Sequence, residues 1–174
     1  PSEVQHCVAH VLGVPSAQVT VEVRRMGGGF GGKESQANQW ACLAAIAAWK
    51  PGRPCKIRLD RDDDMVMTGK RHDDVADFQV AYDPSGKILA TEMHFMARCG
   101  YSADLSGGVN DRTMFHADNA YYYPSVRVRS ERLKTNTVTN TAFRGSGRPQ
   151  GILAAERIID TLSVLTGSDA LEIR

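Results

Sequence analysis

The sequence predicts an α+β fold in which helices pack on layered mixed or antiparallel sheets. Three patterns support this prediction: apolar residues that alternate with polar ones, apolar residues at helical spacing, and a turn sequence between two alternating segments. Hydrophobic residues make up 42% of the 174 residues and charged residues 24%, which is typical of a globular protein. This length is enough for one core or for a large part of a bigger domain.

The N-terminal residues predict a helix followed by a strand. Ser2 and Gln5 have the spacing of a capping box, and valines at helical spacing continue until Gly13. Residues 19–25 then alternate between valines and polar side chains. We therefore expect a strand there with one solvated face.

A glycine-rich run separates this strand from the next predicted helix. Residues 27–32 contain five glycines around Phe30. Glycine reaches positive φ and has no Cβ, so such a run lets the backbone approach a ligand closely. Small residues then predict a helix from about Lys33 to Trp49, residues 55–59 predict a half-exposed strand, and the acidic run 60–64 predicts the start of a short helix.

The middle of the chain predicts an antiparallel hairpin. Residues 78–82 alternate, residues 83–86 have the turn sequence Asp-Pro-Ser-Gly, and residues 87–99 read as a long return strand.

The C-terminal third predicts a second glycine loop that leads into a helix. A short helix is expected near residues 112–115, a strand at 126–133 and a polar loop at 135–141. After the glycines of segment 145–147, Pro149 suits a first helical position, and apolar residues at helical spacing follow. The N–H groups at both helix starts are therefore available to an anion or an electron-rich atom.

Composition and cysteine spacing exclude several classes of function. A net charge of +1 gives no broad basic surface for nucleic acid, and no apolar run is long enough to span a membrane. The four cysteines are far apart and form no Cys-x-x-Cys pair. This pattern is typical of reduced thiols in an intracellular, cytoplasmic protein and supports neither a zinc site nor an iron–sulfur cluster.

Two common phosphate-binding motifs are nearly matched by the first glycine run. The glycine spacing fits a dinucleotide fingerprint, with Asp60 as a candidate ribose ligand, but residues 19–25 carry charges that a strand buried on both faces would not. The run also begins like a P-loop, but Glu34 stands where a serine or threonine would bind magnesium. Metal sites at His6 and His10 or at the acidic run 60–64 lack further ligands.

A resemblance to a known family accounts for more of the chain. The motifs that carry it occur in family order: Arg25–Glu34, Gly52–Pro54, Leu59–Met65, Gly69–His72, Asp111–Arg112, Met114–His116, Asp118–Asn119, Lys134–Asn136, Asn140–Gly145 and Pro149–Gly151. The sequence resembles the molybdenum hydroxylases, and within them the xanthine dehydrogenase/oxidase group of the bacterial type. The resemblance implies that residues 1–174 are an internal segment of a molybdopterin-binding domain of the aldehyde oxidase/xanthine dehydrogenase kind.

The resemblance also implies an activity and cofactors. Members of this family hydroxylate a ring carbon with oxygen from water, and xanthine dehydrogenases convert hypoxanthine and xanthine to urate. The molybdenum cofactor would be bound here, and electrons would pass to 2Fe-2S clusters and FAD in other domains or subunits of an oligomeric enzyme. The general-base glutamate of the family has no counterpart in this sequence, so the segment alone is expected to be inactive. A molybdenum-dependent aldehyde or N-heterocycle oxidase and a degenerate, non-catalytic subunit are the alternatives.

Eight candidate site residues follow from the resemblance. The backbone of Gly29, Phe30 and Gly31 would bind the cofactor, as would that of Arg144, and Phe30 and Arg144 would lie beside the molybdenum. Those that would bind the purine are Glu34, Arg112, Phe143 and Ser146.

Each substrate residue has a chemical role in this resemblance. Glu34 can accept from a ring N–H, and Arg112 can bind a carbonyl oxygen and stabilise negative charge on the ring. Phe143 matches an aromatic that packs on the ring. Ser146 and Arg148 depart from the family pattern, which usually has a second phenylalanine and a small residue there. The departure indicates altered xanthine turnover or a wider pocket.

Overall fold

The computed structural model describes all residues from 1 to 174. The chain divides into two compact units, Pro1–Gly69 and Lys70–Arg174, which are described separately below. None of the helices combines the length and the apolar composition that crossing a membrane requires.

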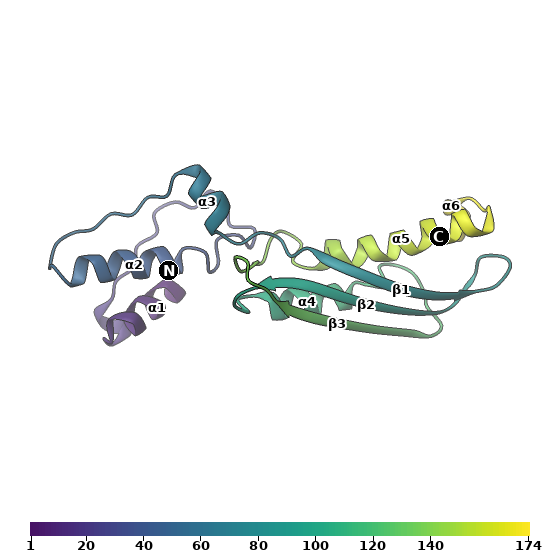
Figure 1. Cartoon of the computed structure of the whole chain (residues 1–174), viewed down its shortest axis with the longest axis horizontal. Helices are drawn as coiled ribbons and strands as arrows, with labels where there is room; N and C mark the ends of the chain where they lie inside the picture. Colours follow the sequence, from purple (N-terminus) through teal and green to yellow (C-terminus); the bar gives the residue numbers. More distant parts are fainter. The chain divides into compact units, whose positions relative to one another are not determined.

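Unit 1 is helical. It contains α1 (Ser2–Leu12), the short 3-10 helix η1 (Ser16–Gln18), α2 (Asn38–Trp49) and α3 (Arg61–Met67), joined by extended segments (Figure 1). Helix α1 packs against α2. The buried side chains of α1 are Val8 and Ala9, which are 8% and 3% exposed.

Two strands that the sequence predicted in unit 1 do not form. Residues 19–25 and 55–59 have no strand assignment, and neither segment pairs with a strand of the sheet. An alternating pattern favours an extended backbone, but a strand also needs a hydrogen-bonding neighbour. The predicted start of α2 was also wrong, because residues 30–37 form turns and bends and the helix begins at Asn38 rather than Lys33.

The helix caps of unit 1 partly follow the predictions. Pro1 rather than Ser2 is the N-cap of α1, and no side chain caps this end. Gly13 ends the helix in the left-handed region at φ 68°, as predicted. Asp60 caps α3, because its Oδ1 accepts a 2.9 Å hydrogen bond from the Asp63 N–H.

Unit 2 is a three-stranded sheet covered by helices. Its strands are β1 (Asp74–Tyr82), β2 (Ile88–Gly100) and β3 (Val126–Lys134), and its helices are α4 (Ser106–Phe115), α5 (Arg148–Thr166) and α6 (Ala170–Ile173). The strand order is β1-β2-β3 (Figure 1). Strands β1 and β2 are antiparallel, whereas β2 and β3 are parallel. The α+β prediction and the mixed sheet are confirmed.

The hairpin follows the predicted turn. The Gly86 N–H donates to the Asp83 carbonyl at 2.9 Å, and Gly86 has a φ of 88° that favours glycine. Because β2 and β3 are parallel, residues 101–125 cross over between them and carry α4. Helix α6 was not predicted from the sequence.

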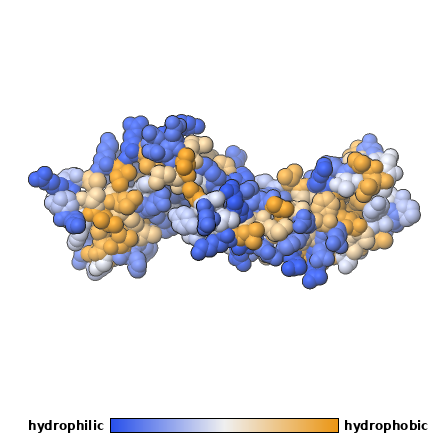
Figure 2. All heavy atoms as spheres, viewed as in Figure 1, coloured by the Kyte–Doolittle hydropathy of each residue, from blue (hydrophilic) through white to orange (hydrophobic).

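The two units differ in their cores. In unit 2, β2 contributes Met93 and Phe95, each 1% exposed, which pack with Ile158 and Leu162 of α5. In unit 1, helix α2 is strongly apolar but has no fully buried residue, and Trp49 is 63% exposed. Apolar side chains therefore reach the surface in this part of the chain (Figure 2).

Candidate functional site

The first glycine loop, residues 27–32, has a backbone that few residue types can adopt. Gly27, Gly28 and Gly31 have φ angles of 67°, 104° and 84°, and Phe30 itself has a φ of 53°. A phenylalanine in the left-handed region is uncommon, and backbone strain of this kind concentrates at functional sites. Phe30 is 63% exposed, whereas its neighbours Gly29 and Gly31 are partly buried.

Local contacts shape this loop. The Phe30 ring folds over Gly28, where an added Cβ would lie 2.6 Å from the ring atom Cε2. The Gly32 N–H donates to the Gly29 carbonyl at 3.0 Å, and the Lys33 ammonium donates to the Met26 carbonyl. No strand leads into this loop and no helix begins at its end, which argues against the dinucleotide fingerprint.

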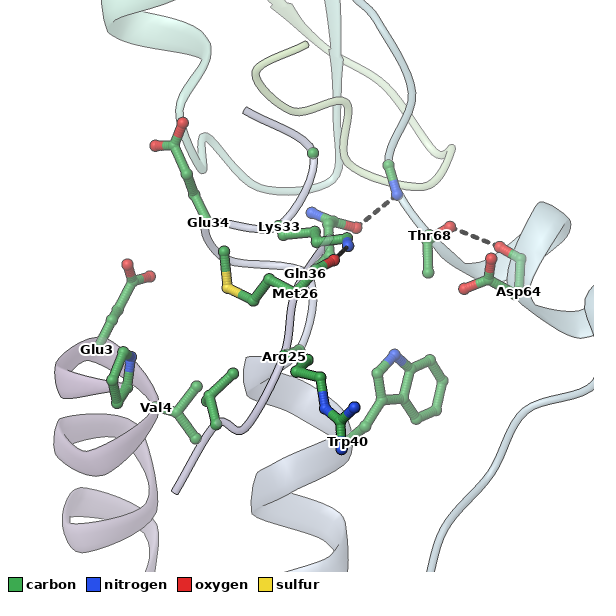
Figure 3. A pocket seen from close by; sticks show the side chains of 15 residues that line it. Glu3, Val4, Arg25, Met26, Lys33, Glu34, Gln36, Trp40, Asp64 and Thr68 are labelled. Atoms are coloured by element: carbon green, nitrogen blue, oxygen red, sulfur yellow. Dashed lines mark hydrogen bonds between the residues drawn. The ribbon is translucent and has the colours of Figure 1, made fainter. Parts of the chain in front are cut away.

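Glu34 lies beside a pocket of about 540 Å³ within unit 1. Charged side chains at this pocket come from different elements: Glu3 from α1, Arg25 and Lys33 from the glycine-rich segment, and Asp64 from α3 (Figure 3). Trp40 adds an aromatic wall. The pocket therefore offers hydrogen-bond donors and acceptors next to an apolar surface, as small-molecule sites do.

One side chain ties this region to the end of the unit. Gln36 Oε1 accepts a 2.6 Å hydrogen bond from the Gly69 N–H (Figure 3). Sequence patterns gave no signal for this contact, because it joins two irregular segments that are 33 residues apart.

The second glycine loop, residues 143–147, leads directly into α5. Gly145, Ser146 and Gly147 have φ angles of 94°, 40° and 94°. The Ser146 N–H donates to the Phe143 carbonyl at 2.6 Å, and the Arg148 N–H donates to the Gly145 carbonyl at 3.0 Å. Gly147 is the N-cap of α5 and no side chain caps this end, so the predicted loop-to-helix arrangement is confirmed.

Helix α4, which carries Arg112, packs tightly against the second loop and the start of α5. A Cβ added to Gly147 would overlap the Val109 carbonyl oxygen and lie 2.8 Å from Thr113 Oγ1. A Cβ on Gly151 would overlap the Thr113 carbonyl oxygen. Only glycine lets the helix and the loop approach this closely.

The candidate substrate residues of unit 2 are exposed to different degrees. Arg112 is exposed in the last turn of α4, where His116 Nδ1 lies 3.0 Å from its carbonyl oxygen. Phe143 is 48% exposed. Ser146 Oγ donates to the Phe143 carbonyl at 3.2 Å, so this hydroxyl is turned back toward its own loop.

The candidate residues thus form two groups, each assembled within one unit. Unit 1 contains residues 29–31 and, three residues further along the chain, Glu34 at the pocket described above. Unit 2 places the helix of Arg112 against the loop of Phe143, Arg144 and Ser146.

Three residues near the second loop, His72, Gln150 and Arg71, make contacts that the sequence did not predict. The His72 ring is 2% exposed, its Nε2 lies 2.7 Å from Ser106 Oγ, and its pKa is lowered by burial. Gln150 Nε2 donates to the His72 carbonyl at 3.0 Å, which fastens the start of α5 to this segment. Arg71 contacts the loop itself. No group of three or more histidine, cysteine, aspartate or glutamate side chains could hold a metal ion in this chain.

Known proteins resemble the chain over almost its full length. It is 45% identical to xanthine dehydrogenase/oxidase of Mus musculus over 170 residues, or 98% of this chain and 13% of that protein. It is 43% identical to a nicotinate hydroxylase of Emericella nidulans over 172 residues, or 99% of this chain and 13% of that protein. The chain therefore spans about 13% of the length of these curated relatives.

Solved structures share the fold. Quinoline 2-oxidoreductase from Pseudomonas putida 86 superposes with a TM-score of 0.84 at 27% identity, covering 100% of this chain and 22% of that one. An aldehyde oxidoreductase from Desulfovibrio gigas superposes with a TM-score of 0.77 at 28% identity, covering 97% of this chain and 18% of that one. The profile of the molybdopterin cofactor-binding domain family matches residues 1–174. The chain therefore belongs to the molybdopterin cofactor-binding domain family.

Proposed function

We propose that residues 1–174 are an internal segment of a molybdenum hydroxylase and supply cofactor- and substrate-binding residues for the hydroxylation of a purine. The observation that carries the proposal is the pair of glycine loops with positive φ at Phe30 and Ser146, within a chain of this family. The proposed enzyme is an oxidoreductase of the xanthine dehydrogenase kind.

The first loop fits a bound molybdenum cofactor. Nothing lies within 4 Å of the place where a Cβ on Gly27 would be, and Phe30 is 63% exposed, so the loop leaves open space beside its backbone. Gly29, Phe30 and Gly31 would bind the cofactor there, and Arg144 would do so in the second loop. When bound, the cofactor supplies the two-electron oxidation and the transfer of oxygen. Backbone N–H groups suit its oxo, sulfur and phosphate atoms.

Glu34 and Arg112 would hold the purine. The Glu34 carboxylate is exposed at its pocket and can accept from a ring N–H. The exposed Arg112 guanidinium can donate to a carbonyl oxygen and stabilise negative charge that develops on the ring. Phe143 would pack on the ring face.

Ser146 favours a second candidate, the oxidation of another N-heterocycle or of an aldehyde. A small hydroxyl bonded to its own loop leaves room where a phenylalanine ring would stack. Two relatives are named for the N-heterocycles nicotinate and quinoline, and this supports the second candidate. A degenerate, non-catalytic subunit is a third candidate, and the molybdenum content of the assembled protein separates it from the other two.

The complete protein would need further components. We propose that electrons pass to 2Fe-2S clusters and FAD in another domain or subunit, and that the enzyme is a cytoplasmic oligomer of purine catabolism.

The test is steady-state kinetics of the complete enzyme with hypoxanthine and xanthine. Glu34→Ala and Arg112→Met should each lower kcat/KM by about 2–3 kcal/mol of transition-state stabilisation. Glu22→Ala and Arg127→Met are matched controls, since both side chains are exposed in surface ion pairs, and they should leave kcat/KM unchanged. Near-wild-type kinetics for both site variants would rule out the purine assignment.

A further inference from the structure

Arg71 makes two contacts with the second glycine loop at once. Its Nη2 donates to the Arg144 carbonyl at 2.6 Å, and its guanidinium carbon lies over the Phe143 ring, 5.0 Å from the centroid. The first contact fixes the backbone of one candidate cofactor residue. The second fixes the ring of a candidate substrate residue.

The remaining part of the guanidinium is enclosed beneath the loop. Arg71 Nη1 is shielded from solvent and makes no hydrogen bond, and a Cβ added to Gly145 would lie 3.9 Å from it. This nitrogen of the guanidinium therefore lies close to the turn at Gly145.

The segment that carries Arg71 is anchored on both sides. The Thr141 N–H donates to the Lys70 carbonyl at 2.9 Å, and Gln150 Nε2 donates to the His72 carbonyl at 3.0 Å. Thr141 precedes the loop and Gln150 follows it. Arg71 is thus held from both flanks of the loop that it contacts.

We infer that Arg71 is the positioning residue of the second glycine loop: it fixes the Phe143 ring and the Arg144 backbone through one planar cation. The inference rests on the proposed function in giving this loop a role in cofactor and substrate binding. Lysine cannot replace it, because an ammonium group is not planar and cannot both stack on a ring and donate sideways to a carbonyl.

Hydrogen exchange of the complete polypeptide tests the geometry without relying on activity. In Arg71→Met, the amides of Ser146 and Arg148, which close the turn, should exchange about ten- to a hundredfold faster, since a charge-assisted hydrogen bond is lost. Arg71→Lys should not restore slow exchange. Arg157→Met is the matched control, an exposed arginine on α5, and should leave both amides unchanged. Unchanged exchange in Arg71→Met would overturn the inference.

A rescue experiment separates positioning from a general loss of stability. Arg71→Ala leaves a space of guanidinium shape, so methylguanidinium should restore slow exchange at both amides and methylammonium should not. Equal effects of the two cations, or no rescue, would contradict a positioning role.

Kinetics of the same variants link the loop to the proposed chemistry. Arg71→Met should lower kcat/KM at least tenfold while Arg157→Met leaves it unchanged, and methylguanidinium should recover part of the loss in Arg71→Ala. If the wild-type enzyme holds no molybdenum and oxidises no heterocycle, the proposed function fails, whereas the exchange result still decides the role of Arg71. Faster exchange with unchanged kcat/KM would contradict the link between the loop and catalysis.

Discussion

Both glycine loops contain a phenylalanine and glycines with positive φ, but Gly27 and Gly147 are required for different reasons. In the first loop, an added Cβ on Gly27 meets nothing within 4 Å, and glycine is favoured there by its φ of 67°. In the second loop, an added Cβ on Gly147 would overlap the Val109 carbonyl. The dihedral angle alone therefore demands glycine at Gly27, whereas at Gly147, where φ is 94°, close packing demands it as well.

The two loops should therefore differ in how strongly a substitution changes their conformation. The first loop belongs to a unit with few buried side chains and leads into turns. The second is fixed between α4 and α5, whose contact continues at Gly151. We expect the conformation of the second loop to depend on the stability of unit 2, and that of the first to depend on a few local hydrogen bonds.

The largest expected effect comes from substituting these two glycines by alanine in the complete protein. Gly147→Ala should destabilise unit 2 by more than about 3 kcal/mol, because helix α4 must move away. Gly27→Ala should cost only about 1–2 kcal/mol, for the left-handed dihedral alone. Hydrogen exchange of the α5 amides measures the loss for Gly147→Ala, exchange of the α2 amides measures it for Gly27→Ala, and thermal unfolding is recorded for both variants. Equal losses of stability in the two variants would contradict the difference between the loops.

A second prediction concerns the stability penalty of the ionised Asp74 carboxylate, which is partly buried in unit 2. Burial, together with the negative charge of Asp73, raises the pKa of the Asp74 carboxyl from 3.8 to about 6, and neither carboxyl oxygen makes a hydrogen bond. Because the folded state holds this proton more tightly, no penalty exists below about pH 4. Stability is lost as the pH rises from there to about 6, and the penalty is then complete.

Asp74→Asn should remove this penalty. The shift corresponds to a gain of about 3 kcal/mol at pH 7, with almost no gain at pH 3.5, and urea unfolding at the two pH values measures it. Asp77→Asn is the control, an exposed carboxylate on the same strand. A gain that is the same at both pH values would point to packing rather than to charge.

A smaller effect is expected where one hydrogen bond holds the segment after the first loop. Gln36→Ala removes the acceptor of the Gly69 N–H and should cost about 1–2 kcal/mol of local stability, seen as faster exchange of the Gly69 amide. Gln39→Ala serves as the control, because Gln39 is an exposed glutamine that lies close to Gln36 in the sequence, at the start of α2. An unchanged Gly69 amide would show that this segment is held by other contacts.

The smallest expected effect is on substrate choice. Ser146→Phe should improve xanthine turnover by about 1 kcal/mol in kcat/KM, through stacking on the ring. The φ of 40° at Ser146 is close to the 53° that Phe30 adopts, so the backbone can carry an aromatic residue there. If turnover falls, Ser146 belongs to a pocket of another shape. Competition between xanthine and a bulky aldehyde provides the readout.

Much of unit 2 could be predicted because its signals are local. The turn at residues 83–86, the alternation of β2 and Pro149 at the start of α5 each depend on neighbouring residues. In unit 1 the strands predicted at residues 19–25 and 55–59 do not form, since alternation cannot show whether a strand has a hydrogen-bonding partner. The late start of α2 was missed because a run of turns follows Phe30.

For the candidate site, the sequence indicated the two loops but not what holds them. Positive φ at glycines could be expected from their number, and the resemblance pointed to Glu34 and Arg112. The contacts of Arg71 and Gln36 could not be predicted, because each joins residues more than 30 positions apart. The roles of all these residues in binding stay predictions.

The parallel pairing of β2 with β3 also has a consequence for the order of folding. The hairpin of β1 and β2 needs only neighbouring residues, whereas β3 can pair only after residues 101–125 have crossed the sheet. Arg112 lies on that crossover and the second glycine loop follows β3. Arg112 and this loop would therefore reach their final positions in the same late step, so slow refolding and loss of this half of the candidate site should occur together.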